Sequence, residues 1–186
     1  MSKIFVILFL LFCSLSFADN FSSNASYQVC FTPGENCIPK IVAAIDSAQQ
    51  QILVQAYSFN QRDIIHALVA AHKRGVTVKI LLDKDILNHR ALLKYLQRQQ
   101  LWLKIDTQPA IAHNKVMILD TRTVITGSFN FTFAAAKDNA ENVLIISDAV
   151  FAQQYIKNWY ERERQSVVAD AQNFERPQMF STTRQK

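Results

Sequence analysis

The sequence contains few cysteines. The apolar run near its N-terminus is too short to cross a membrane as a helix. Cys13 is one of three cysteines among 186 residues and lies in that apolar start. The other two have no histidine nearby, so they cannot complete a tetrahedral zinc shell. The run itself, residues 4–12, has nine residues, whereas a spanning helix needs about 20. These shortages argue against a zinc-based nucleic-acid-binding module and against a membrane span in this segment.

The start of the chain has the features of a signal peptide. Lys3 supplies a positive charge, the apolar run follows, and Ser16 and Ala18 are small residues where signal peptidase cleaves. We therefore expect residues 1–18 to be removed and the protein to be periplasmic or secreted. An uncleaved anchor is the alternative. A lipoprotein site at Cys13 is disfavoured because the bulky Phe12 precedes it.

The remaining 168 residues suffice for one domain with a full core, and they contain no internal repeat. We expect the domain to span residues 19–167 and a C-terminal tail without apolar periodicity to span 168–186. Loss of Lys3 lowers the formal charge from +5 to +4. This mildly basic balance suits a polyanionic partner without requiring one.

The two remaining cysteines, Cys30 and Cys37, enclose a turn of Thr32, Pro33 and Gly34. Such a turn can fold the segment back on itself. Export would place both thiols in an oxidising compartment. We therefore predict a disulfide rather than a metal site.

Helical and strand patterns alternate along the mature chain and predict an α/β fold. The expected helices are 38–48, 64–72, 85–100 and 149–165, with a short helix within 131–139. The expected strands are 52–59, 76–82, 101–105, 116–119, 124–126 and 143–147. We expect a mixed β-sheet with helices packed against it.

Four polar side chains flank the hairpin that the strands 116–119 and 124–126 form. His113 and Lys115 lie two apart, so on a strand they share one face. Ser128 and Asn130 repeat this spacing after the second strand. An imidazole can attack phosphorus or carry a proton, and the other three groups can hold anionic oxygens.

These residues resemble the signature of the phospholipase D superfamily, H-x-K-x4-D followed by G-S-x-N. The matching residues are His113, Lys115, Asp120, Gly127, Ser128 and Asn130, and Glu141 stands in the family's usual place for an acidic residue. From about residue 29 to 160 the chain is similar to the small, single-motif bacterial endonuclease branch. The resemblance implies that helices cover both faces of the mixed sheet, with one copy of the fold per chain. At Gly127, the missing Cβ would let a ligand approach the backbone.

The resemblance also implies a homodimer, because the superfamily's chemistry uses two motifs and this chain has one. His113 of one copy would be the nucleophile and His113 of the other the general acid. Lys115, Ser128 and Asn130 would bind the phosphate oxygens. Glu141 would accept a hydrogen bond from the His113 ring and fix its tautomer.

Two further expectations concern the hairpin turn and cofactors. Asp120 lies seven residues from His113, so we expect a structural role for it at the turn. The scheme needs no cofactor and no metal ion.

The expected substrate is nucleic acid, with DNA preferred and RNA as an alternative, bound through its phosphates with little sequence preference. The small size of the chain leaves no room for a separate lipid-binding domain. Two alternatives remain open: a phospholipase D acting on membrane phospholipids, and a nucleic-acid-binding protein without turnover.

Overall fold

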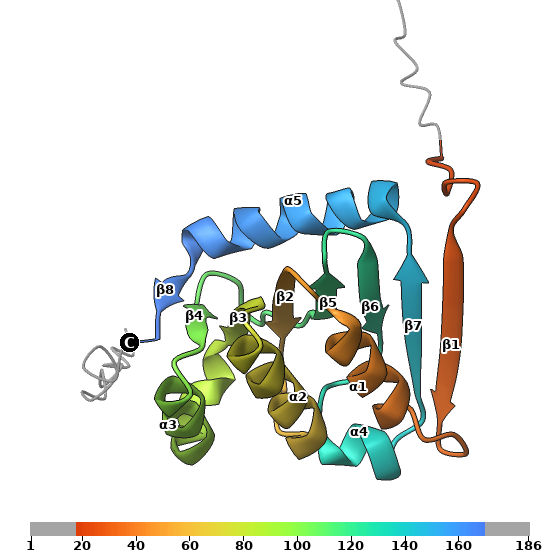
Figure 1. Ribbon diagram of the computed structural model, residues 1–186. Helices are drawn as coiled ribbons and strands as arrows, with labels where there is room; N and C mark the ends of the chain where they lie inside the picture. The colour runs from red at the N-terminus through yellow and green to blue at the C-terminus, as the bar shows by residue number, and fades with distance from the viewer. Residues whose placement is uncertain (1–17, 170–186) are drawn as a thin grey trace, which may run out of the picture.

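Eight strands form one mixed β-sheet in the order β1-β7-β6-β5-β2-β3-β4-β8 (Figure 1). The structure is a computed structural model that describes residues 18–169. The strands are β1 (Ser26–Thr32), β2 (Gln51–Ala56), β3 (Thr77–Asp83), β4 (Trp102–Asp106), β5 (Lys115–Leu119), β6 (Thr123–Gly127), β7 (Glu141–Ser147) and β8 (Val167–Val168). β2, β3 and β4 run parallel, and the other neighbouring pairs are antiparallel.

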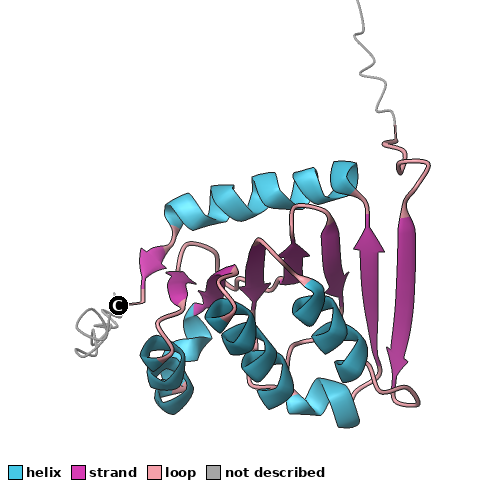
Figure 2. Cartoon of the chain, viewed as in Figure 1, coloured by secondary structure: helices cyan, strands magenta, loops and turns pink. Residues whose placement is uncertain are grey.

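Helices cover both faces of this sheet, which confirms the predicted fold class. They are α1 (Ile38–Ser47), α2 (Arg62–Lys73), α3 (Arg90–Arg98), α4 (Phe133–Lys137) and α5 (Ala149–Gln165), with a 3-10 helix η1 (Lys84–Asn88) before α3. Figure 2 shows α1, α2 and α3 on one face and the long α5 crossing the other.

Apolar side chains fill both spaces between the helices and the sheet. Ile41, Leu68 and Ile80 are fully buried in the larger core under α1 and α2. On the α5 side, Trp159 is fully buried, and its indole N–H donates to the Val54 carbonyl at 3.0 Å. The central strands are therefore buried on both faces, which explains their nearly continuous apolar sequences.

The predicted helix 85–100 is wrong in one respect, because it is two elements. Asp83 accepts a hydrogen bond from the Asp85 N–H at 2.8 Å and so begins the 3-10 turn. His89 then leaves helical geometry, with φ −105° and ψ 52°, before α3 begins. The local cap at Asp83 and the non-helical backbone of His89 thus interrupt the predicted helix.

Strand β1 is an edge strand that the sequence patterns did not predict. It pairs antiparallel with β7, so that Ser26 lies opposite Ser147. Its outer edge is capped at two points, because Glu35 accepts from the Phe31 N–H at 3.1 Å and Lys40 Nζ donates to the Val29 carbonyl at 3.3 Å. These two side chains also form an ion pair.

The disulfide predicted between Cys30 and Cys37 is present and links β1 to the start of α1, with Cα atoms 5.7 Å apart. Both cysteines are buried. The turn that carries Glu35 and the start of α1, which carries Lys40, are therefore tied to the strand that they protect.

The two ends of the described chain bear on the predicted boundaries. At the C-terminal side, β8 pairs with β4, and the Ala169 N–H donates to the Leu103 carbonyl at 3.2 Å, so the sheet continues past the expected domain end at residue 167. The expected signal peptide, except Ala18, and residues 170–186 of the tail lie outside the described residues. Between residues 18 and 169, no helix has both the length and the apolar composition of a membrane span.

Candidate functional site

All motif residues except Asp120 meet at one edge of the sheet, where strands β2 and β6 end and strands β5 and β7 begin. The register places Lys115 opposite Ala56 of β2 and Gly127 opposite Val143 of β7. The carboxyl end of the parallel strand β2 therefore lies beside the first half of the motif, and Phe59, which follows β2, bridges to Phe131, directly after the second half. In open α/β sheets, ligands bind at this kind of edge.

His113 is exposed and lies just before β5 rather than on the strand, since β5 begins at Lys115. Its ring packs against the ring of Tyr57, with centroids 4.9 Å apart and planes at 50°. Among the side-chain hydrogen bonds of residues 18–169, none involves the His113 ring. The imidazole is thus accessible to a substrate and is contacted by an aromatic ring.

Lys115 is almost completely buried, with 8% of its surface exposed. Its Nζ donates to the His113 carbonyl at 2.8 Å and lies 5.4 Å from the centre of the Tyr57 ring. Burial lowers the pKa of the Lys115 ammonium, and the negative charge of Glu141 partly opposes this effect. The site therefore holds a poorly solvated cation directly behind the exposed imidazole.

Glu141 contacts Ser128, whereas the sequence predicted that it would contact the His113 ring. Ser128 Oγ donates to Glu141 Oε2 at 2.5 Å, and Asn139 Nδ2 donates to Glu141 Oε1 at 3.0 Å. Ser128 Oγ also accepts from the Asn142 N–H at 3.1 Å. Both carboxylate oxygens are thus engaged at the start of β7, and the predicted bond to His113 is not formed in this structure.

The neighbouring strand gives a reason for a glycine at position 127 besides the ligand approach that the sequence predicts. Gly127 has φ +144°, and a Cβ added there would lie 2.2 Å from the Asn142 carbonyl oxygen. The close approach of the neighbouring strand β7 therefore leaves no space for a Cβ at this position. This contact sets the position of Ser128, the next residue.

Asn130 is held in a tight loop between β6 and α4. The Thr132 N–H donates to its carbonyl at 2.6 Å, and the N–H groups of Asn60 and Gln61 both donate to the Phe131 carbonyl at 2.9 Å. The Asn130 side-chain oxygen is buried and has no hydrogen-bond partner. Buried polar atoms without a partner are uncommon, and they often mark functional positions.

Asp120 lies at the turn between β5 and β6, far along the strand from His113. Its carboxylate accepts hydrogen bonds from the N–H groups of Gln49, Gln50 and Gln51, at 2.8 to 3.0 Å. Burial raises its pKa, but these three backbone donors lower it, and the net shift is downward. Asp120 therefore ties the hairpin to the start of β2.

Two residues of this edge carry no motif signal and were missed from the sequence. Tyr57 follows β2, and Asp83, which is buried, ends β3 and accepts from the Ala112 N–H at 2.6 Å. Tyr57 comes directly after an apolar strand and Asp83 ends one, and these two strands run parallel. That position was the available signal, since such strand ends gather at one edge.

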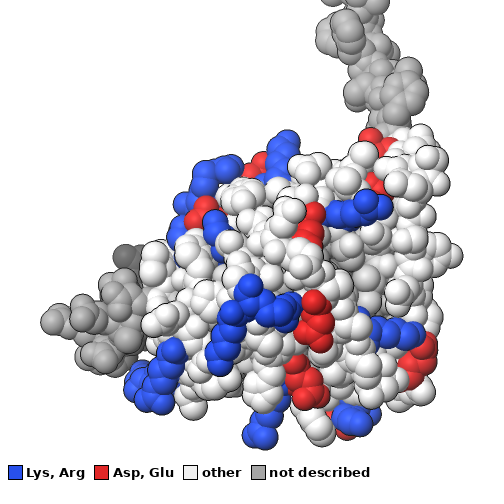
Figure 3. Space-filling view, viewed as in Figure 1, with Lys and Arg blue, Asp and Glu red and all other residues white. Residues whose placement is uncertain are grey.

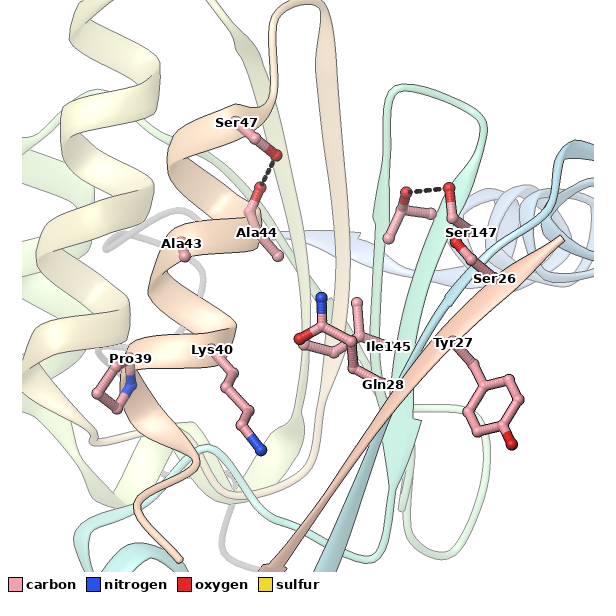
Figure 4. A pocket seen from close by; sticks show the side chains of 11 residues that line it. Ser26, Tyr27, Gln28, Pro39, Lys40, Ala43, Ala44, Ser47, Ile145 and Ser147 are labelled. Carbon is pink, nitrogen blue, oxygen red and sulfur yellow. Dashed lines mark hydrogen bonds between the residues drawn. The ribbon is translucent and has the colours of Figure 1, made fainter. Parts of the chain in front are cut away.

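The hollow shown in Figure 4 is separate from this site. It has a volume of about 500 Å³ and lies between α1 and the strands β1 and β7. Lys40, Ser47 and Ser147 are among its lining residues, and no motif residue lines it. Within residues 18–169, no group of three or more histidine, cysteine, aspartate or glutamate side chains is arranged to hold a metal ion.

Comparison with known proteins identifies relatives of the whole domain. Residues 41–162 match the family model described as "Cardiolipin synthase, PLD-like domain". A phospholipase D of Rickettsia typhi is 46% identical over 147 residues, which are 78% of this chain and 72% of that protein. Human mitochondrial cardiolipin hydrolase is 28% identical over 127 residues, covering 68% of this chain and 50% of its own.

A solved structure supports the same relationship. Nuc, a phospholipase D family member from Salmonella typhimurium, matches with a TM-score of 0.74 and 39% identity, over 77% of this chain and 97% of Nuc. The sequence match, the fold and the motif at the sheet edge agree. This chain belongs to the phospholipase D superfamily, whose members are phosphodiester hydrolases.

Proposed function

We propose that the protein is an exported, metal-independent endonuclease that cleaves DNA, with RNA as an alternative substrate, through a covalent phosphohistidine. The observation that carries this proposal is the position of His113, exposed at an open sheet edge with the buried Lys115 ammonium behind it. A phosphodiester in an extended polymer backbone can reach such an imidazole without entering a deep pocket. The motif's resemblance to the endonuclease branch supports the same substrate.

The proposed reaction has two steps. A ring nitrogen of His113 attacks phosphorus, the bond to the leaving oxygen breaks, and that oxygen takes a proton from His113 of a second copy. The second imidazole, now neutral, removes a proton from water. The water oxygen attacks phosphorus and the phosphorus–nitrogen bond breaks, which restores both histidines. Lys115, Ser128 and Asn130 stabilise the phosphoryl oxygens.

The second imidazole is supplied by a homodimer. The chain has one H-x-K motif, and an isologous contact brings the same residue of two copies close to the axis. Two large apolar side chains flank the motif and are exposed, Ile111 at 55% and Phe133 at 60%. We expect Ile111→Glu to reduce both dimerisation, measured by sedimentation, and cleavage. A monomer with the activity of the parent would disprove the shared site.

A phospholipase activity is the second candidate, because relatives with 46% to 49% identity carry the name "Phospholipase D". The charge distribution does not distinguish a nuclease from a phospholipase. On the face seen in Figure 3, basic and acidic side chains are interspersed over the helices, so this face carries no continuous basic track. The proposal places nucleic acid at the sheet edge that holds the motif.

Cleavage of plasmid DNA and of phospholipid vesicles, both in excess EDTA, tests these proposals. The variants are His113→Ala and, as a matched control, His89→Ala, an exposed histidine before α3. We expect the parent and the control to cut DNA and His113→Ala to be inactive. Cleavage of vesicles alone would establish the phospholipase. Loss of parental cleavage in EDTA would contradict the phosphohistidine scheme.

Export is the remaining part of the proposal. The disulfide supports it, because disulfides persist in oxidising compartments. N-terminal sequencing of protein recovered from the periplasm and the medium should begin at Asp19. Intact chain in the membrane fraction would instead indicate an uncleaved anchor.

A further inference from the structure

We propose that Tyr57 is a positioning residue that holds the imidazole of His113 in its reactive orientation through contact between the two rings. This inference rests on the proposed role of His113 as the nucleophile. Tyr57 lies outside the sequence motif, at the carboxyl end of β2, and is half-buried.

The backbone on both sides of His113 is fixed by the ends of two neighbouring strands. The Tyr57 N–H donates to the Asn114 carbonyl at 3.0 Å, and Asp83 accepts from the Ala112 N–H at 2.6 Å. The main chain at His113 is thus held, but its side chain is exposed and can rotate about two torsions. A further contact is needed to select one orientation of the imidazole.

Tyr57 supplies that contact. Its ring centroid lies 4.9 Å from that of His113 with the planes at 50°, within the range of favourable aromatic pairs. Lys115 Nζ lies 5.4 Å from the centre of the same ring, within the range of a cation–π interaction. One ring therefore sets the imidazole and the ammonium relative to each other.

The carboxylate that commonly orients a catalytic histidine is engaged elsewhere. Glu141 accepts hydrogen bonds from Ser128 and from Asn139. In this structure the His113 imidazole instead contacts the ring of Tyr57. Because this contact involves the ring and not the hydroxyl, phenylalanine should replace tyrosine, whereas leucine should not.

Kinetic analysis of Tyr57→Phe and Tyr57→Leu tests the proposal, with Tyr27→Leu as the control. Tyr27 is 74% exposed on the edge strand β1. The substrate is bis(4-nitrophenyl) phosphate, an activated diester that does not depend on a nucleic-acid or lipid preference. For Tyr57→Leu we expect kcat to fall by about 10- to 100-fold with a smaller change in KM, because small misplacements of reacting groups have effects of this size. Tyr57→Phe and Tyr27→Leu should keep the parental kcat.

The ring proton resonance of His113 gives a readout that does not require turnover. The chain has four histidines, so this resonance is assigned by its loss in His113→Ala. We expect Tyr57→Leu to shift it by removing the ring current, and Tyr57→Phe to leave it in place. Thermal melts of each variant show whether a loss of activity comes from unfolding.

The outcomes separate this inference from the proposed function. An unmoved resonance, or a Tyr57→Leu protein that turns over like the parent, would overturn the positioning role. Equal defects in Tyr57→Phe and Tyr57→Leu would assign the effect to the hydroxyl and would also overturn it. If the parent cleaves no diester, the proposed function fails, and the resonance still decides whether the rings are in contact.

Discussion

The hydroxyl of Ser128 donates a hydrogen bond to Glu141 Oε2 at 2.5 Å, across the gap between the end of β6 and the start of β7. If this bond orders Ser128, which we propose binds phosphate, Ser128→Ala and Glu141→Ala should each reduce cleavage. Because both changes remove the same bond, the double variant should lose less than the sum. The expected coupling in kcat/KM is about 0.5–3 kcal/mol.

A double-mutant cycle on kcat/KM measures this coupling. Ser147→Ala is the matched control, because Ser147 lies at the far end of β7, accepts a hydrogen bond from Thr123 and touches no motif residue. Strictly additive losses would show that Ser128 and Glu141 act independently.

Lys115→Met should lower the rate of cleavage by about 100- to 1,000-fold, because it removes a preorganised cation. The same change should alter how stability depends on pH. The folded-state pKa of Lys115 lies below its ordinary value of 10.5, so the folded protein loses this proton before the unfolded chain does. Between these two pKa values the unfolded state binds more protons, and the free energy of unfolding of the parent rises with pH.

Urea titrations of the parent and of Lys115→Met across the alkaline range measure this effect. The stability of the parent should rise relative to the variant as pH increases through the window below 10.5. Parallel profiles would mean that burial does not perturb Lys115.

Gly127→Ala should destabilise the protein by about 2–4 kcal/mol, because it combines an unfavourable φ with a clash of its Cβ against β7. Gly34→Ala is the control, since Gly34 has φ +122° but open space around a new Cβ. It should lose only about 1 kcal/mol, for the backbone strain alone. Urea unfolding gives both values, and equal losses would show that the approach of Asn142 is unimportant.

Asp120→Asn should lower stability at neutral pH by about 1 kcal/mol, because the amide oxygen cannot replace a carboxylate that accepts from three backbone N–H groups. Asparagine tolerates the left-handed φ of +48° at this position. Since the folded-state pKa of Asp120 is lowered, its contribution is present above the ordinary value of 3.8 and is lost as pH falls through the folded-state pKa.

Thermal melts of this variant between pH 2 and 7 test the sign of that dependence. The difference from the parent should shrink toward the acid end. Asp138→Asn, at an exposed position after α4, should change neither the midpoint nor its pH dependence.

The core elements were predictable because their patterns are local. The apolar run of β3 and the helical spacing of α2 each indicate one structure, and the predicted helix 149–165 has the observed bounds of α5. β1 was missed because an edge strand leaves one row of its side chains in solvent, and Tyr27 and Phe31 are exposed. β1 is a strand because it pairs with β7, and no local sequence pattern reveals this pairing.

The candidate site was also predictable only where the sequence signal is local. The spacing of the motif predicts which residues meet, and the structure brings His113, Lys115 and Ser128 to one edge. The spacing of the motif does not predict which partner each side chain binds. Glu141 binds Ser128 because both lie where β6 meets β7, and that neighbour relationship arises from the sheet order.

The position of β1 has a consequence for how the chain folds. β1 is the first strand of the described chain, yet it pairs with β7. The pairing therefore requires contact between Ser26 and Ser147, which are distant in sequence. Pairs this distant in sequence close slowly, because a long loop must be ordered first. During synthesis, β1 has no strand partner until almost all of the domain has been made. The turn between Cys30 and Cys37 contains only local contacts and can form before β7 is made. We therefore expect the first strand to be among the last to join the sheet.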